Sequence, residues 1–314
     1  MTRAFVFPGQ GSQAVGMGRE MAEAFPAARL VFEEVDEALH QNLSRLMFEG
    51  PESELTLTEN AQPAIMAASL AVLRVLEADG KLDIAAHCKF VAGHSLGEYS
   101  ALAAAKTLGV AQAARLLKTR GRAMQKAVPV GEGAMAALIG LDRNAVDEIS
   151  VLAAAETKSA CAPANDNAPG QIVISGAKAA VTFAAAEAEK RGARAVMLPV
   201  SAPFHCALMK SAAEAMENAL ANAELADPLV PVIANVTAEA VQDAEEIRRL
   251  LVEQVTSMVR WRESVLYMKA HDVDTLVEVG AGRVLAGLAK RIDREIAAVS
   301  VGTPADVEKF LASV

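Results

Sequence analysis

The chain carries the sequence KFVAGHSLGEYSALAAAK at residues 89–106. Residues 90–92 form a short apolar run, which is typical of a buried strand, and residues 98–106 are rich in Ala and Leu, which favours a helix. Between them lies a GxSxG motif at 93–97 with Ser95 at its centre. Where this motif joins a strand to a helix, a sharp turn exposes the serine hydroxyl above an α/β sheet. The alternative, an incidental motif in a loop, is disfavoured by the strand and helix on its two sides.

On both sides of this stretch, segments with strand character alternate with segments of helical character. Strands are predicted at 3–7, 231–236, 275–279 and 297–301, and helices at 17–42 with a break at Pro26, at 62–78 and at 110–126. This alternation predicts an α/β fold with a mostly parallel sheet covered on both faces. A Gly-rich turn at 8–13 follows the first strand, in a position that often contacts a ligand.

A different order of elements begins near residue 133. Strands are predicted at 134–141, 159–163, 171–175 and 194–200, with helices at 143–155 and 177–191. The order β-α-β-β-α-β is that of a ferredoxin-like unit. We therefore predict a ferredoxin-like small subdomain at 131–198 inserted into a discontinuous α/β subdomain at 1–130 and 199–314, with the chain crossing at 129–133 and 201–203.

Composition limits the classes of protein that the chain can form. With 314 residues, of which 53% are hydrophobic and 4% aromatic, it suits one large α/β unit with an insertion. We expect no membrane span, because charge or glycine interrupts every long apolar stretch, and no signal peptide, because Pro8 and Gly9 come too early. A cytoplasmic location is the resulting expectation.

Cysteine content and charge exclude further classes. The three cysteines Cys88, Cys161 and Cys206 are odd in number and widely spaced, so neither a disulfide framework nor a metal site is expected. The formal charge is −9 and no basic domain is present, which makes nucleic acid an unexpected partner. An anionic partner would have to meet a local basic patch.

A serine nucleophile needs a base, and the five histidines are the first candidates. His205 follows a predicted strand in an irregular segment, where its side chain can face a cleft at the carboxyl edge of the sheet; a surface or structural histidine is the alternative. His94 is a weaker candidate, because neighbours on a tight turn diverge. His40 and His271 lie on polar stretches and are expected to be solvated.

An acid that orients the histidine is not evident. Asp142, Asp147 and Asp166 lie between Ser95 and His205, but all three fall in the predicted insertion. A backbone carbonyl can hold the Nδ1 proton instead, which would leave a Ser-His dyad.

Acyl transfer also needs donors for an oxyanion and contacts for the acyl group. One donor is expected to be the Leu96 backbone N–H, directly after the nucleophile. Gln10, between two glycines, can bring a second N–H close, unless its turn is purely structural. Arg120 precedes Gly121 in the cationic segment 115–122, and a guanidinium pairs bidentately with a carboxylate. The alternative for this segment is a solvated basic face.

Several motifs together resemble one family, the malonyl-CoA:acyl-carrier-protein transacylases of type II fatty acid synthesis. The similar segments are Phe7 to Gln13, Gln62 to Ala64, Gly93 to Tyr99, Arg120-Gly121, Asn165 to Gly176, His205 to Met209 and Glu278 to Gly280. The resemblance implies a hydrolase-like large subdomain with a ferredoxin-like insertion. It also implies malonyl-CoA and acyl carrier protein as partners, with no resident cofactor and no metal.

The resemblance also implies residue roles. Ser95 would take the malonyl group and His205 would act as base and then acid. The backbone amides of Gln10 and Leu96 would form the oxyanion hole, and Arg120 would pair with the malonyl carboxylate. Gln62 and Asn165 would line the site, and a main-chain carbonyl at Arg260 would orient the histidine. Independently of these roles, both the chain and the expected carrier protein are acidic, so a local basic patch is needed. Segment 115–126 and Lys190-Arg191 are the candidates, either for carrier-protein docking or for the phosphates of CoA.

Two positions depart from the pattern of the family. Phe204 stands before the histidine where several bacterial relatives have a small residue, and a bulky ring there should disfavour an α-methyl group on the substrate. Gly280-Ala281-Gly282 replaces Gly-Pro-Gly, which should alter only the rigidity of a turn.

Two other functions stay open at this point. A serine hydrolase, either an esterase or a thioesterase, would use the same turn and histidine but release the acyl group to water. A catalytically silent docking module for a carrier protein would bind without acyl exchange.

Overall fold

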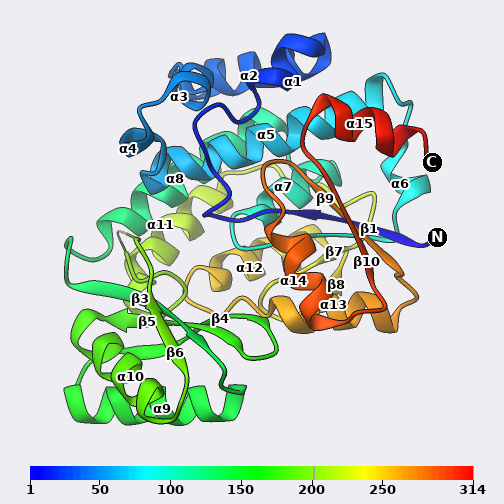
Figure 1. The fold of residues 1–314 in the computed structure, drawn as a ribbon. Coiled ribbons are helices and arrows are strands. Elements are labelled where there is room, and N and C mark those ends of the chain that lie inside the picture. The colour runs from blue at the N-terminus through cyan, green and yellow to red at the C-terminus, as the bar shows by residue number, and fades with distance from the viewer. Residues whose placement is uncertain (201, 314) are drawn as a thin grey trace.

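A computed structural model describes residues 1–200 and 202–313, which form a large α/β layered region and a smaller region beside it (Figure 1). The larger sheet has six strands in the order β10-β9-β1-β2-β7-β8. All neighbouring pairs are parallel except the antiparallel pair of β7 and β8. The α/β fold class with a mostly parallel sheet is confirmed.

The strands of this sheet are short, and β1, β2, β7 and β9 are largely buried. Their bounds are β1 Arg3–Phe7, β2 Phe90–Gly93, β7 Val232–Ile233, β8 Ala240–Val241, β9 Thr275–Val279 and β10 Ala297–Val301. Side chains alternate between the two faces of the sheet: Phe5 and Val91 join one core cluster, whereas Val6 and Ala92 join the other. Burial on both faces explains why the central strands read as apolar runs instead of alternating patterns.

Helices cover both faces of the sheet. Those before and directly after the nucleophile motif are α1 Arg19–Ala24, α2 Pro26–Leu39, α3 Leu43–Glu49, α4 Glu52–Leu55, α5 Thr58–Ala78, α6 Ile84–His87, α7 Gly97–Ala104 and α8 Val110–Lys126. The predicted helix at 17–42 does break at Pro26, which begins α2, because proline suits the first turn of a helix.

Helix α5 is longer and more apolar than the sequence reasoning expected. By length and composition it could cross a membrane, although no such segment was expected. In the fold, 83% of its most apolar window is buried. The helix packs against α2 and α8, so its apolar character is accounted for by the protein core.

The second sheet has the antiparallel order β4-β5-β3-β6. Its elements are β3 Gly133–Ile139, α9 Arg143–Thr157, β4 Cys161–Ala168, β5 Gln171–Ala177, α10 Lys178–Lys190 and β6 Arg194–Met197. Their order is the predicted β-α-β-β-α-β order, and α9 and α10 share a core with this sheet. The exact subdomain boundaries at 130/131 and 198/199 stay predictions, and Ser201 at the second crossing lies outside the described residues.

Several strands differ in length from their predictions, and β6 ends at Met197 instead of residue 200. β4 begins and ends later than the predicted 159–163, and its pairing with β5 shifts register around Pro163 and again before Ala168. These irregularities interrupt the alternation on which a strand prediction depends. β7 covers only two residues of the predicted 231–236.

The chain returns to the large region through η1 Ala207–Met209 and α11 Lys210–Ala221. The remaining helices are α12 Ala244–Gln254, α13 Trp261–Ala270, α14 Val284–Ile292 and α15 Pro304–Leu311. α13 and α14 pack on the face of the sheet opposite to α5 and α8.

The turn between β2 and α7 depends on glycine because three backbone segments meet there. A Cβ on Gly93 would lie 1.9 Å from the carbonyl carbon of Gly97, and one on Gly97 would lie 2.3 Å from the Phe7 carbonyl oxygen. Backbone atoms cannot yield as a flexible side chain can. The carboxyl ends of β1 and β2 are therefore locked against the start of α7.

We predict that Gly93→Ala lowers the free energy of unfolding by about 3 kcal/mol or more, because the new methyl group overlaps backbone atoms. Gly287→Ala is the matched control: it lies inside α14 with no atom within 4 Å of its Cβ position. That change should stabilise the protein by about 0.5–1 kcal/mol. Denaturant unfolding of both variants checks the difference, and similar midpoints for the two would contradict the packing of the turn.

Candidate active site

Ser95 occupies the turn in a backbone conformation that only a well-supported site retains. Its φ is 54°, in the left-handed region that non-glycine residues rarely adopt. The side chain of Asn235 supports it: Oδ1 accepts the Ser95 N–H at 2.7 Å and Nδ2 donates to the Gly93 carbonyl at 2.7 Å. One buried amide thus holds both sides of the nucleophile.

His205 contacts this serine directly. Its Nε2 lies 2.7 Å from Ser95 Oγ. Its Nδ1 lies 2.9 Å from the Gln254 carbonyl oxygen and 3.1 Å from that of Ser257. Because carbonyl oxygens only accept, Nδ1 carries the proton and Nε2 is free to accept the serine hydroxyl proton. The arrangement is a Ser-His dyad with a backbone partner instead of a carboxylate.

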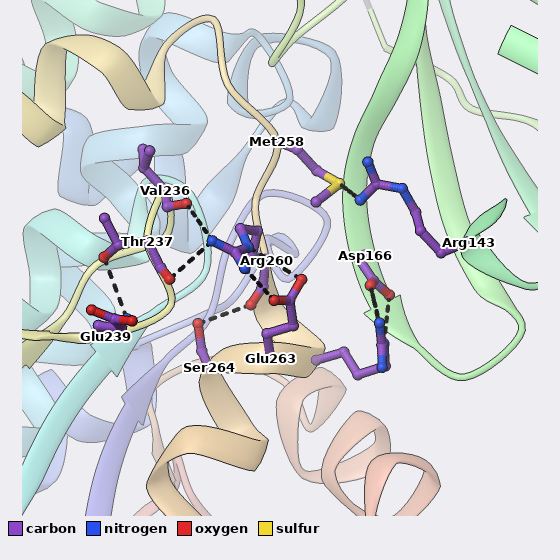
Figure 2. A network of polar contacts seen from close by, with 10 residues as sticks. Arg143, Asp166, Val236, Thr237, Glu239, Met258, Arg260, Glu263 and Ser264 are labelled. Carbon is purple, nitrogen blue, oxygen red and sulfur yellow. Dashed lines mark hydrogen bonds and ion pairs between the residues drawn. The ribbon is translucent and has the colours of Figure 1, made fainter. Parts of the chain in front are cut away.

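The structure corrects the prediction for Arg260, whose carbonyl does not contact His205. That oxygen accepts the N–H and the hydroxyl of Ser264 at 2.9 Å each, in the first turn of α13. The side chain of Arg260 contacts the carbonyls of Val236 and Thr237 and pairs with Glu263 (Figure 2). The helix start uses the Arg260 carbonyl, and carbonyls at the end of α12 and in the following loop hold the histidine.

The three aspartates between Ser95 and His205 in the sequence interact with residues other than His205. Asp166 is buried and forms an ion pair with Arg262, at 2.8 Å (Figure 2). Asp142 accepts the Ala145 N–H at the start of α9, and Asp147 pairs with Arg143 one turn along that helix. None of these three acids bonds His205.

The environment of His205 keeps its imidazole neutral. Burial, together with the nearby Arg120 cation, lowers the pKa of His205 to about 3. Both effects disfavour a second positive charge in the site. At neutral pH the ring is therefore available as a base.

Arg120 comes from α8 and is buried, with 1% of its surface exposed. Its guanidinium donates to Gln62 Oε1 at 2.9 Å, Ser95 Oγ at 3.1 Å and Gln254 Oε1 at 2.9 Å. All three acceptors are neutral, and the buried Nε–H has no hydrogen-bond partner in the part of the chain that the structure describes. Among the described residues no carboxylate lies within ion-pair distance of this guanidinium, so an anionic ligand would gain from reaching it.

α8 can bring Arg120 this close because of the next residue. Gly121 lies against the start of α5, where a Cβ would sit 2.6 Å from Glu59 Cα. Leu116 and Leu117, which lie among the cations of this segment, are buried. The basic segment is not one solvated face: Lys118 is buried and donates to Gln41 and Asn60, whereas Arg122 is exposed and pairs with Glu59.

Most of the predicted site residues line one cavity of about 650 Å³. They are Gln10, Gln62, Ser95, Arg120, Asn165, Phe204 and His205. Asn165 reaches it from β4, whose backbone also bridges to Val259. The structure thus brings residues from both regions of the chain to the same serine.

The two expected oxyanion donors lie on adjoining loops. Leu96 follows Ser95 at the start of α7, and the turn carrying Gln10 packs on the same motif, because a Cβ on Gly9 would lie 2.7 Å from the His94 carbonyl oxygen. Within the described chain, no hydrogen bond uses the backbone N–H of Gln10 or Leu96. Both groups are available to a ligand.

His94 points away from the nucleophile, as expected for a neighbour on a tight turn. Its Nε2 lies 2.8 Å from Asn167 Oδ1, and its ring packs against Trp261. His271 lies at the end of α13, stacked on Tyr267. Neither histidine bonds Ser95.

Sequence reasoning missed three buried polar residues. Gln254 bonds Arg120, the Ser95 carbonyl and Glu98, and Asn235 holds the serine turn. Glu98 accepts from Gln254 and from the Asn235 N–H, and burial raises its pKa to about 7. Glu98 adjoins the GxSxG motif, so proximity in sequence was its one available signal.

The residues that the structure describes contain no ligand set of the kind that binds metal ions in proteins. No group of three or more His, Cys, Asp or Glu side chains there is placed to hold a metal ion. The chemistry of the cavity instead rests on a hydroxyl, a neutral imidazole and a buried guanidinium.

We predict that Ser95 keeps its nucleophilic reactivity in mild acid, because His205 stays neutral there. Labelling by a fluorophosphonate should change less than about twofold between pH 8 and pH 5.5, whereas a histidine with an ordinary pKa would lose about tenfold. The measurement is the pseudo-first-order labelling rate by intact mass, with Ser95→Ala as the blank. An inflection near pH 6.5 would contradict the buried, neutral imidazole.

Comparison with known proteins gives this site its context. The sequence profile of the acyl transferase domain matches residues 4–304. Malonyl CoA-acyl carrier protein transacylases of Bacillus subtilis and Escherichia coli are 45% and 46% identical, with 97% and 96% of this chain and 95% and 96% of those proteins covered.

Two solved structures extend the similarity to the fold. An acyl-carrier-protein-S-malonyltransferase from Bartonella henselae has a TM-score of 0.97 at 56% identity, covering 100% of this chain and 99% of its own. A malonyl-transacylase in complex with its type II PKS acyl-carrier protein has a TM-score of 0.96 at 43% identity, with both chains covered in full. With its nucleophile turn, its histidine and these relatives along its whole length, the chain belongs to the acyl transferase domain family, among the malonyl CoA-acyl carrier protein transacylases.

Proposed function

We propose that Ser95 carries a malonyl group from malonyl-CoA to the phosphopantetheine thiol of acyl carrier protein in a ping-pong reaction. Membership of the family makes the chain an acyltransferase of this class. The observation that carries the residue assignment is the convergence of three groups in one cavity: the Ser95 hydroxyl, the neutral His205 imidazole and the buried Arg120 guanidinium.

In the first half-reaction, Ser95 Oγ attacks the thioester carbonyl of malonyl-CoA. His205 Nε2, 2.7 Å away, takes the hydroxyl proton as the new C–O bond forms. The tetrahedral oxyanion is held by the N–H groups of Gln10 and Leu96. When the C–S bond breaks, the proton passes to the departing CoA sulfur, which leaves a malonyl ester on Ser95.

The second half-reaction uses the same groups. The carrier-protein thiol gives its proton to His205 and attacks the ester, and the Ser95 oxygen recovers that proton as it leaves. No metal, redox group or other cofactor enters either half. A thioester is consumed and a thioester is formed, so the balance of bonds allows the reaction to run in both directions.

Arg120 supplies the selectivity for malonyl in this proposal. Its guanidinium reaches Ser95 Oγ at 3.1 Å, so a carboxylate attached to an acyl group on that oxygen lies within its range. An acetyl group lacks the carboxylate and leaves the cation unpaired in a buried setting, which is unfavourable. Phe204, which also lines the cavity, narrows the room for an α-methyl group.

Hydrolysis is the competing chemistry at such a serine. It differs only in the final acceptor, water instead of a thiol. The similarity to a malonyl-transacylase solved with its acyl-carrier protein favours the thiol. The same combination of nucleophile, base and guanidinium argues against a silent docking module.

The docking patch predicted from sequence becomes smaller once ion pairs are considered. Arg122 pairs with Glu59, Lys190 with Glu187 and Arg191 with Glu148. In the described chain, Arg115 and Lys126 have no ion-pair partner in segment 115–126, so we propose these two as the cations available to an acidic carrier protein. We further propose a cytoplasmic enzyme of fatty acid synthesis that uses neither nucleic acid nor membrane.

The function is tested by incubating the protein with malonyl-CoA and recording intact mass, with and without holo acyl carrier protein. We expect a malonyl adduct that is absent in Ser95→Ala, persists without the carrier and moves to the carrier when it is added. Loss of the adduct at the same rate with and without the carrier would instead identify a hydrolase, and binding without any adduct would identify a docking module.

We predict that Arg120→Ala lowers kcat/KM for malonyl-CoA by about a hundredfold, the effect of losing a buried charge pair, and raises acetyl-CoA use relative to malonyl-CoA. Arg122→Ala, an exposed arginine on the same helix, is the matched control and should leave both values within about twofold. The measurement is the transfer rate with each thioester. Equal loss for both substrates in Arg120→Ala would argue against a contact with the carboxylate.

A further inference from the structure

Glu98 is a buried carboxyl group that the reaction steps above do not use. It lies in the first turn of α7, three residues after the nucleophile, and only 3% of its surface is exposed. Burial of a carboxyl group is unfavourable unless its oxygens are hydrogen-bonded. The hydrogen bonds of Glu98 must therefore compensate for the burial of its carboxyl group.

Two hydrogen bonds to Glu98 converge on one of its oxygens. Oε2 accepts from Gln254 Nε2 at 2.7 Å and from the Asn235 backbone N–H at 3.1 Å. These partners are the two residues that surround the nucleophile: the Asn235 side chain holds the Ser95 turn, and Gln254 bridges to Arg120. Glu98 is therefore the common support behind the site.

The Gln254 amide has two different ends, and its surroundings fix which end points where. Nε2 donates to Glu98 and to the Ser95 carbonyl at 3.0 Å, and both of these groups act as acceptors. Oε1 accepts from Arg120, whose guanidinium only donates. A flipped amide would place Nε2 against the guanidinium and Oε1 against the two acceptors, losing all three contacts.

We propose that Glu98 is a positioning residue for acyl-group selectivity: through Gln254 it fixes the Arg120 guanidinium over Ser95. This inference rests on the proposed function: the position of Arg120 affects selectivity only if its guanidinium pairs with the malonyl carboxylate. Glu98 touches neither substrate nor Ser95 Oγ in this arrangement. Glu98 acts on Arg120 through the side-chain amide of Gln254.

The position of the acceptor oxygen, and not the charge, is the critical property in this arrangement. Gln at 98 can put its own carbonyl oxygen where Oε2 lies and accept from the same two donors. Asp keeps the charge but withdraws the oxygen by about one methylene, roughly 1.5 Å, which is beyond what a 2.7 Å hydrogen bond tolerates. The two conservative variants therefore separate charge from position.

The experiment measures the ratio of kcat/KM for malonyl-CoA to kcat/KM for acetyl-CoA in Glu98→Gln and Glu98→Asp. We expect Glu98→Gln to keep the wild-type ratio within about twofold and Glu98→Asp to lower it about tenfold. A purely structural role would lower the melting temperature or the fraction of active enzyme without moving this ratio. Active-site titration with a fluorophosphonate corrects each preparation for its active fraction.

Gln254→Leu tests whether Glu98 acts through the amide. This change should itself lower the ratio about tenfold, and Glu98→Asp in that background should lower it less than about twofold further, because the link is already gone. Equal effects of Glu98→Asp in both backgrounds would overturn the proposal. So would a ratio that falls in Glu98→Gln but not in Glu98→Asp, since that pattern would make charge the important property.

Wild-type enzyme distinguishes a failure of this inference from a failure of the proposed function. If wild type shows no preference for malonyl-CoA, the role of Arg120 is wrong and the proposed function fails. If wild type prefers malonyl-CoA and both Glu98 variants keep that preference, the positioning role alone is overturned.

Discussion

Close approach of three backbone segments at the end of β2 is the constraint on which the rest of the site depends. The carbonyls of Phe7 and His94 and the start of α7 meet where only Gly93, Gly97 and Gly9 leave room. At this contact Ser95 adopts a left-handed conformation, and the turn that carries Gln10 packs against the His94 carbonyl. The nucleophile and the two proposed oxyanion donors are therefore placed by the same packing, before any substrate binds.

A buried cation is the second feature that organises the site. No carboxylate of the described residues pairs with Arg120, which is held by neutral oxygens from Gln62, Ser95 and Gln254. Such an arrangement is unfavourable for folding alone, because each neutral contact compensates only part of the lost hydration. The cost is consistent with a site prepared for an anion, since the free energy recovered on pairing is then available for substrate selection.

The sequence predicted the parts of this site that local motifs encode. Ser95 sits in a GxSxG pattern between strand and helix, and the α/β alternation predicted the sheet correctly. The hydrogen-bond partners of His205 Nδ1 could not be predicted from a local motif. Carbonyl groups are common to all residues, so nothing in the sequence distinguishes those of Gln254 and Ser257 from that of Arg260, and only the path of the loop after α12 decides between them.

Gln254 and Asn235 escaped prediction for a related reason. Each is more than 130 positions from Ser95 in the chain, and neither amide belongs to a motif with a known spacing. Their roles follow from tertiary packing that brings the end of α12 and the segment after β7 beside α7. Pattern reasoning recovers groups whose chemistry is distinctive, whereas the polar contacts that orient those groups become evident only in three dimensions.

The position of Arg120 links substrate recognition to the strength of the base. Burial contributes most to the lowered pKa of His205, and the positive charge of Arg120 comes second. In the proposed reaction a malonyl carboxylate neutralises that charge, so the Coulombic part of the effect weakens while burial remains. It follows that His205 becomes a stronger base when the acyl group carries a carboxylate than when it does not. One guanidinium would thus favour malonyl both by holding it and by raising the basicity of the imidazole that activates Ser95.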